Sequence, residues 1–128
     1  MFPLITKSTN KEPSEEQLEN VIQLYKEGDL GTILILATYL LSQFPNSIIL
    51  HNFLGICHTK LGNFESAIKN YTVILKSTPQ DRNNHFNLAN LYMYLGKFDE
   101  ALIRYQKILE INSIDFETYN NMGICWKH

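Results

Sequence analysis

The chain has 128 residues, of which 45% are apolar and 19% charged, a composition that fits one folded domain and excludes an intrinsically disordered chain. Its 11 Lys and Arg residues nearly balance its 13 Asp and Glu residues, giving a formal net charge of −2 without long runs of one sign. Nucleic acid is therefore not expected as a partner.

The first segment, residues 1–13, carries no helical periodicity and is expected to be a mobile leader. It lacks the apolar core of a signal peptide, and no apolar run in the chain approaches the roughly 18 residues of a membrane span. Cys57 and Cys125 stand alone, without a Cys-x-x-Cys pair. These features predict a cytoplasmic protein with no membrane partner.

After the leader, the sequence repeats itself every 34 residues. Gly28, Gly62 and Gly96 keep this interval, as do Pro45 and Pro79. Further pairs hold the same register: Leu54 with Leu88, Phe64 with Phe98, Ala67 with Ala101, Tyr71 with Tyr105, and Ile74 with Ile108. Each unit contains two amphipathic stretches of helix length separated by the glycine, which predicts a helix-turn-helix hairpin.

In chain order, helices are expected at 14–27, 29–44, 47–61, 63–76, 82–95 and 98–111, with a further one starting near Asp115. A capping box, Ser14-Glu15-Glu16-Gln17, marks the first start. These helices group into an atypical first repeat at 14–47, a second repeat at 48–81, a third at 82–115 and, at 116–128, the first helix of a truncated fourth. Residues 14–128 are thus expected to form one array.

Two of these units carry a recognisable pattern of small and aromatic residues: Leu54-Gly55, Gly62-Asn63-Phe64-Glu65, Ala67-Ile68, Tyr71 and Pro79, and again Leu88-Ala89, Gly96-Lys97-Phe98-Asp99-Glu100-Ala101 and Tyr105. This pattern resembles the tetratricopeptide repeat. The resemblance implies an all-α fold, a right-handed superhelical solenoid of antiparallel helix hairpins with about seven helices. It also implies a protein–protein interaction scaffold and not an enzyme.

The first unit departs from this pattern, with Val21 and Ile33 where the others have small residues and Ala37 where they have tyrosine. Such an atypical unit is expected to cap the N-terminal end of the array. The fourth unit stops after one helix, and its apolar Met122, Ile124 and Trp126 do not suit a solvating end. We therefore expect a fragment of a larger protein.

Residues with catalytic or metal-binding chemistry have a simpler explanation in the repeat. His51 and His85 occupy equivalent positions, and so do Cys57 and Cys125, which favours packing or surface roles. No zinc-binding spacing, nucleophile elbow or phosphate-binding glycine loop is present. The sequence predicts no catalytic residue, no metal and no cofactor.

A binding hypothesis comes from the concave surface that the first helix of each hairpin (helix A) lines in this family. By the family's spacing, this peptide-binding groove contains Asn52, Phe53, Ile56, Phe86, Asn87, Asn90, Tyr94, Asn120, Asn121 and Ile124. Asn87 and Asn121 fall at matching positions and could hydrogen-bond an extended peptide in successive steps. An equally good explanation is that these are surface asparagines without a ligand.

Relatives that clamp the acidic tails of heat-shock chaperones use lysine and arginine on these helices. The corresponding positions here are Leu18, Ile22, Phe53, Asn83 and Asn87, or, one unit later, Asn52, Ile56, Asn87, Glu117 and Asn121. Neither set supplies the cations of a carboxylate clamp. That specialisation is not expected.

Three functions remain open from sequence. The first is a scaffold that binds an extended peptide of unidentified origin. The second is an N-terminal recognition segment of a larger bacterial enzyme, either a glycosyltransferase, a sulfotransferase or a methyltransferase. The third is a self-associating module whose open ends stack into an end-to-end homo-oligomer.

Overall fold

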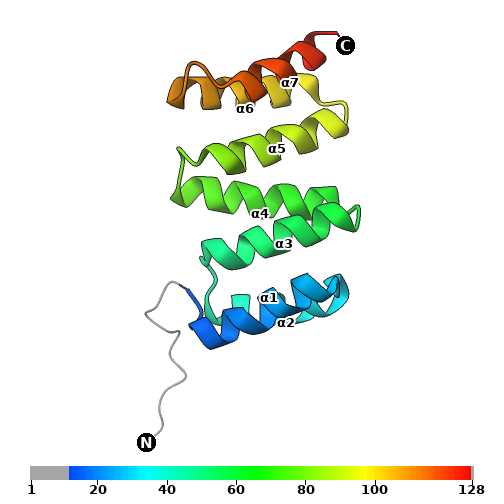
Figure 1. Ribbon diagram of the computed structural model, residues 1–128, viewed down its shortest axis with the longest axis vertical. Coiled ribbons are helices and arrows are strands. Elements are labelled where there is room, and N and C mark those ends of the chain that lie inside the picture. The colour runs from blue at the N-terminus through cyan, green and yellow to red at the C-terminus, as the bar shows by residue number, and fades with distance from the viewer. Residues whose placement is uncertain (1–11, 128) are drawn as a thin grey trace, which may run out of the picture. The chain divides into compact units, whose positions relative to one another are not determined.

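A computed structural model describes residues 12–127, which form seven α-helices (Figure 1). The helices are α1 (Glu15–Glu27), α2 (Leu30–Gln43), α3 (Ile48–Lys60), α4 (Phe64–Ser77), α5 (Arg82–Tyr94), α6 (Phe98–Ile111) and α7 (Phe116–Trp126). Every boundary expected from sequence lies within one residue of the observed one. The all-α fold built from helix hairpins is confirmed.

The helices begin where short polar side chains satisfy the free N–H groups of a first turn. Ser14 forms a complete capping box with Gln17 at the start of α1. The remaining side-chain caps come from Asp29 for α2, Ser47 for α3, Asp81 for α5 and Asp115 for α7. The start of each A helix is thus encoded locally by one residue.

The ends of α1, α3 and α5 share one backbone motif centred on the repeating glycines. Gly28, Gly62 and Gly96 have φ angles of 77°, 80° and 76°, in the left-handed region that other residues avoid. After α5, the Gly96 N–H donates to the Met93 carbonyl at 3.0 Å and the Lys97 N–H donates to the Tyr92 carbonyl at 2.8 Å. This is a Schellman motif, and it turns the chain directly into the next helix.

The chain divides into two compact units, one ending at Asn70 and the other beginning at Tyr71, so that the division falls within α4. In the first unit, Val21, Ile33 and Ala37 are fully buried in one core with Leu40 and Leu50. Val21 and Ile33, which are larger than their counterparts in the other repeats, thus pack in the same core as Ala37, which is smaller than its counterparts. The volumes offset one another, which accounts for the atypical residues of the first repeat.

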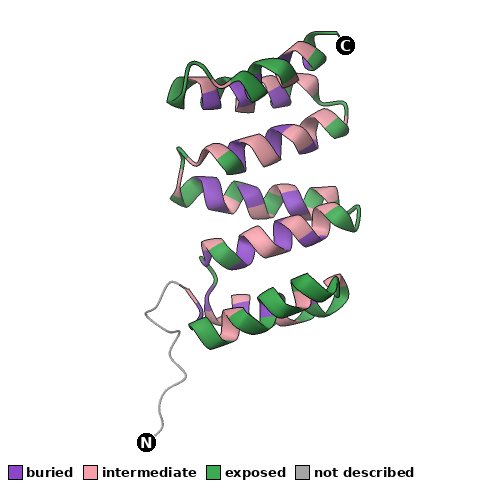
Figure 2. Cartoon of the chain, viewed as in Figure 1, coloured by how far each residue is buried: buried purple, intermediate pink, exposed green. Residues whose placement is uncertain are grey.

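The second unit is built around α5, α6 and α7. Ala89 and Ala101 are fully buried, so the backbones of α5 and α6 approach closely, and Tyr105 fills the space beside them. Met122 and Cys125 of α7 complete this core. Figure 2 shows the resulting stripe of buried residues along α5 and α6, with exposed residues at the helix ends and turns.

The expected leader, 1–13, lies outside the described residues except for its last two positions. Pro13 is buried, and the carboxylate of Glu12 accepts hydrogen bonds from the Ser47 hydroxyl and from the Ile48 N–H at 2.9 Å. Glu12 is therefore bound at the start of α3, because a carboxylate at a helix N-terminus meets free N–H donors. The expected mobility does not extend to Glu12, which is bound, or to Pro13, which is buried.

The turn glycines can be tested against a glycine inside a helix. We expect Gly96→Ala to lower the free energy of unfolding by about 1–2 kcal/mol, because alanine is strained at positive φ. Gly123→Ala in α7 is the matched control, since a Cβ has open space at both positions. The control should be neutral or stabilising by up to about 1 kcal/mol through helix propensity. Urea unfolding followed by circular dichroism measures both, and equal effects would contradict the role of the turn.

Candidate functional site

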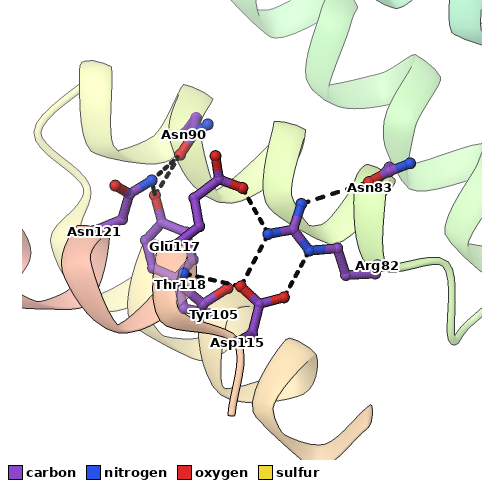
Figure 3. A network of polar contacts seen from close by, with 8 residues as sticks. All are labelled: Arg82, Asn83, Asn90, Tyr105, Asp115, Glu117, Thr118 and Asn121. Atoms are coloured by element: carbon purple, nitrogen blue, oxygen red, sulfur yellow. Dashed lines mark hydrogen bonds and ion pairs between the residues drawn. The ribbon is translucent and has the colours of Figure 1, made fainter. Parts of the chain in front are cut away.

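Polar side chains of α5, α6 and α7 form a network in two parts in the second unit (Figure 3). At one end, the Arg82 guanidinium binds the Asp115 carboxylate through two parallel hydrogen bonds, Nε to Oδ2 at 2.8 Å and Nη2 to Oδ1 at 3.0 Å. Its Nη2 also donates to Glu117 Oε1 at 2.8 Å. One arginine of α5 thus holds two carboxylates at the start of α7.

Asp115 has two roles at this point. Its Oδ1 accepts the Thr118 N–H at 3.1 Å and caps α7, while both of its oxygens bind Arg82. The hydrogen bonds from Arg82 hold the pKa of the Asp115 carboxyl at about 2, well below its usual range. The same contacts raise the pKa of Arg82 further above its already high ordinary value.

Aromatic rings connect this ion pair to the rest of the surface. The guanidinium carbon of Arg82 lies 4.4 Å from the centroid of the Phe86 ring, within cation–π distance. Phe86 in turn meets Tyr105 edge to face, with centroids 6.0 Å apart. The Arg82 side chain is therefore fixed by Asp115 on one side and by an aromatic ring on the other.

A second part of the network joins Asn90, Tyr105 and Asn121. The Tyr105 hydroxyl donates to Asn90 Oδ1, and Asn121 Nδ2 donates to the same oxygen at 3.1 Å. Asn121 Nδ2 also lies 3.3 Å from the Tyr105 hydroxyl oxygen. Burial raises the pKa of the Tyr105 phenol to about 12, so this hydroxyl stays protonated and available as a donor.

Two amide groups of this network remain without a hydrogen bond. Within residues 12–127, neither the Asn90 Nδ2 group nor the Asn121 Oδ1 atom has a hydrogen-bond partner, and the half-buried Asn87 side chain has none either. The fixed pair therefore leaves one donor on α5 and one acceptor on α7. A peptide group has the complementary acceptor and donor.

The other predicted groove residues of the second unit differ in exposure. Phe86 is half-buried under Arg82, whereas Tyr94 is 74% exposed. Asn120 and Ile124 on α7 are also exposed. The structure thus brings Phe86, Asn90 and Asn121 into one network, and it leaves Tyr94, Asn120 and Ile124 on the surface beyond it.

The first unit contains the remaining predicted groove residues, Asn52, Phe53 and Ile56, all half-buried on α3. The Phe53 ring meets Tyr25 of α1 edge to face, with centroids 5.9 Å apart. Lys60 Nζ lies 5.4 Å from the centroid of the same Tyr25 ring. Phe53 is therefore a packed aromatic residue of its own unit and not a free apolar contact.

The histidines and cysteines pack as the sequence predicts. His51 and His85 are buried, and each ring binds the carbonyl of a turn proline through Nε2, to Pro45 at 3.1 Å and to Pro79 at 2.7 Å. Cys57 and Cys125 are buried free thiols, and burial raises the pKa of both, so they are poor nucleophiles.

Sequence reasoning missed Arg82, Tyr105 and Glu117 as functional residues of this surface. Tyr105 belongs to the aromatic pattern of the repeat, and only the tertiary structure shows that its hydroxyl reaches Asn90. Arg82 and Asp115 are 33 residues apart, one short of the repeat, and the order of repeats alone could have suggested that successive A-helix starts are neighbours. No cluster of three or more metal-binding side chains exists among residues 12–127.

Within the described part of the chain, no helix is both long enough and apolar enough to cross a bilayer.

These features define the class of the protein: an all-helical repeat array in which each hairpin reproduces the previous one after 34 residues. A family model described as "Tetratricopeptide repeat" matches residues 83–114, which contain α5 and α6. The chain belongs to the tetratricopeptide repeat family.

Relatives and solved structures agree with this assignment. The chain is 32% identical over 114 residues to the tetratricopeptide repeat-containing protein trd-1 of Caenorhabditis elegans, an alignment that covers 88% of this chain and 14% of that protein. It is 28% identical over 88 residues to the protein O-mannosyl-transferase F38B6.6 of the same organism, covering 69% of this chain and 13% of the relative. The chain therefore spans about a seventh of the length of either relative.

A similar solved structure is the first tetratricopeptide domain of Spaghetti (RPAP3) bound to the HSP90 peptide SRMEEVD. It superposes with a TM-score of 0.78 at 18% identity, covering 91% of this chain and 95% of that one. At this level of identity the likeness concerns the fold.

The Arg82–Asp115 pair makes stability depend on pH. Folding lowers the pKa of Asp115 to about 2 from 3.8. The ionised carboxylate therefore stabilises the folded state above pH 4, and this stabilisation is lost as the pH falls towards 2. We expect a loss of about 2 kcal/mol over this range in the unmodified protein. Asp115→Asn should lower stability at pH 7 by a similar amount and show a smaller loss in acid.

Asp81→Asn is the matched control, because Asp81 caps α5 through the Asn84 N–H in the same way that Asp115 caps α7. Urea unfolding at pH 7 and pH 3 separates the two variants. The same acid dependence in Asp115→Asn as in the unmodified protein would show that the ion pair does not stabilise the fold.

The Tyr105 hydroxyl can be tested by Tyr105→Phe. We expect a loss of about 1 kcal/mol in unfolding free energy, because Asn90 loses a hydrogen bond while the ring packing is kept. The ultraviolet titration of the folded protein should also lose a tyrosine that ionises near pH 12. Tyr94→Phe, on a ring that is 74% exposed, is the control and should keep the titration near pH 12 that Tyr105→Phe loses. If Tyr105→Phe still shows a tyrosine that ionises near pH 12, that phenol belongs to another tyrosine and the assignment to Tyr105 is wrong.

Proposed function

We propose that this protein is an interaction scaffold whose A helices bind an extended peptide segment of a partner protein. The observation that carries the proposal is the fixed pair of carboxamides, Asn90 on α5 and Asn121 on α7, joined through the Tyr105 hydroxyl. Because their shared hydrogen bonds hold both groups in place, binding costs less side-chain entropy than it would with free asparagines. Membership of a family of helical scaffolds supports the same function.

The chemistry of the pair suits a main chain. Asn90 Nδ2 is a donor for a peptide carbonyl, and Asn121 Oδ1 is an acceptor for a peptide N–H. The C=O and N–H of one residue of an extended segment point to the same side and would satisfy both. Asn87, one turn before Asn90 on the same face of α5, would reach a further group along the segment. Exposed Tyr94 and Ile124 would contact its apolar side chains.

The charges of this surface bear on the kind of peptide. Arg82 is already paired with Asp115 and Glu117, and Glu117 is 63% exposed at its side chain. The surface of the second unit therefore offers no unpaired cation among the groove residues, and neutral amides dominate it. We infer that the peptide is read mainly through its backbone, in contrast to the acidic HSP90 peptide of the structurally similar domain.

The experiment selects peptides from a displayed random library on the folded protein and measures their affinity for two variants. Asn87→Ala removes an unpartnered side chain and should weaken binding about three- to tenfold with no change in melting temperature. Asn121→Ala should weaken binding at least as much, and it should also lower stability by about 1 kcal/mol because Asn121 donates to Asn90.

Gln106→Ala is the matched control, since it removes an exposed amide from α6, outside the A helices. It should leave affinity unchanged. Peptides that bind Asn87→Ala and Asn121→Ala as tightly as the unmodified protein would refute the groove assignment.

A second function is favoured by one comparison. The similarity to a segment of an O-mannosyl-transferase supports the alternative that the array recognises substrates for a larger enzyme. In that case the same A-helix surface would bind a segment of the enzyme's substrate. Sequencing the gene beyond the codon for residue 128 distinguishes the two functions, because the second function requires a transferase domain after the array.

A further inference from the structure

The two buried histidines of the repeat have the same position but different surroundings. In both units the Nε2 atom faces a proline carbonyl, Pro45 for His51 and Pro79 for His85. A carbonyl can only accept a hydrogen bond, so Nε2 carries the proton in both rings. Nδ1 of the neutral ring is then an acceptor in both cases.

The acceptor is satisfied in the first unit only. Asn70 of α4 lies 3.0 Å from His51 Nδ1 and serves as its donor. His85 Nδ1 is buried and has no hydrogen-bond partner among residues 12–127. The residue 34 positions after Asn70 is Arg104, which stands in α6 where Asn70 stands in α4. The exchange of asparagine for arginine therefore accompanies the loss of the donor.

A buried acceptor without a partner destabilises a fold by about 1–3 kcal/mol, so it needs an explanation. Here the ring that carries the orphan atom lines a hollow, although Nδ1 itself is closed to solvent. His85 and Arg104 both line this hollow of about 320 Å³ between the start of α5 and α6, together with Leu75, Pro79 and Lys107. A donor from a bound molecule would reach Nδ1 from this hollow once the lining side chains shift.

An adjoining hollow extends the same surface. It has a volume of about 360 Å³ and shares Leu75 and Arg104 with the first. Its other lining residues are Thr72, Lys76, Leu88, Tyr92, Glu100 and Ile103. Both volumes are within the range of small-ligand sites. The first hollow thus has a buried histidine and a cation, and its neighbour places apolar side chains beside the opposite charges of Lys76 and Glu100.

The charges of the first hollow favour one negative group. Lys107 forms an ion pair with Glu110 at 3.6 Å, whereas Arg104 has no ion pair with any residue in the described range. The lining cations, Arg104 and Lys107, exceed the one carboxylate, Glu110, by a single charge. A guanidinium binds a carboxylate through two parallel hydrogen bonds.

These hollows are separate from the proposed groove. His85, Leu88 and Tyr92 recur at helical spacing on one face of α5, and Asn83, Asn87 and Asn90 recur on the opposite face. The two sides of α5 therefore present different chemistry, with neutral amides on one and a cation beside an orphan acceptor on the other.

We propose that the two adjoining hollows form a second peptide-binding site, which takes a partner segment with an acidic residue next to an apolar one. The acidic side chain pairs with Arg104, a backbone N–H of the segment donates to His85 Nδ1, and the apolar side chain enters the hollow beside Leu88 and Tyr92. This site does not depend on the groove of the A helices, and either can fail without the other.

The test titrates ¹⁵N-labelled protein with capped Leu-Asp-Leu, whose central aspartate has leucine on both sides so that either chain direction is sampled. Capped Leu-Asn-Leu, which has the same shape without the charge, is the matched peptide. We expect Leu-Asp-Leu to move the Nδ1 resonance of His85 and the amides around Leu88 and Ile103, with an affinity about tenfold above that of Leu-Asn-Leu.

Arg104→Asn is the decisive variant, because it restores the arrangement of the first unit. Its amide should donate to His85 Nδ1 as Asn70 does to His51, raising the melting temperature and weakening Leu-Asp-Leu binding about tenfold or more. Arg104→Lys keeps the charge and should lose less affinity. Asn87→Ala, on the other face of α5, should bind Leu-Asp-Leu as the unmodified protein does.

Three results would overturn the proposal. The first is the absence of any shift around the hollows at millimolar peptide. The second is equal binding of Leu-Asp-Leu by Arg104→Asn and by the unmodified protein. The third is a His85 shift with inorganic phosphate but with neither peptide, which would make the hollow an anion site and not a peptide site.

Discussion

The left-handed turn at Gly28, Gly62 and Gly96 fixes where the other contacts of the repeat can form. At each turn the chain reverses within two residues, so helix A and helix B of one hairpin meet at a constant register. In the second unit this register places Ala89 opposite Ala101, which lets α5 and α6 approach and puts the Tyr105 ring beside them. The position of the Tyr105 hydroxyl, and hence of Asn90 and Asn121, follows from that approach.

The start of α7 is specified twice, once by its own sequence and once by the preceding repeat. Asp115 caps the helix locally through the Thr118 N–H, and Arg82 binds the same carboxylate from α5. The start of α3 has a related arrangement with the charge reversed, because Glu12 contacts the Ser47 cap. The starts of α3 and α7 are thus each held by a charged side chain from earlier in the chain, Glu12 and Arg82.

On the surface of the second unit, the polar groups available to a ligand are those that these structural contacts leave unpaired. Arg82 is committed to Asp115 and Glu117, so the A-helix face has neutral amides for recognition. Arg104 has no such commitment among the described residues, and it borders a buried histidine whose acceptor is unsatisfied. One helix, α5, therefore separates two surfaces that suit different ligands, and the family resemblance alone directs attention to only one of them.

The sequence by itself determined the hairpin, its 34-residue period, and the caps and turns. These features depend on short-range chemistry, since a capping side chain or a left-handed glycine acts on its own turn. It also placed Asn90 and Asn121 on the predicted groove, but it matched Asn121 with Asn87 and not with Asn90. The bond between Asn90 and Asn121 through Tyr105, the pairing of Arg82 with Asp115 and the unsatisfied Nδ1 of His85 were decided by the tertiary structure alone. Each depends on the direction of a side chain and on the distance between helices, and residue spacing along the chain fixes neither of these.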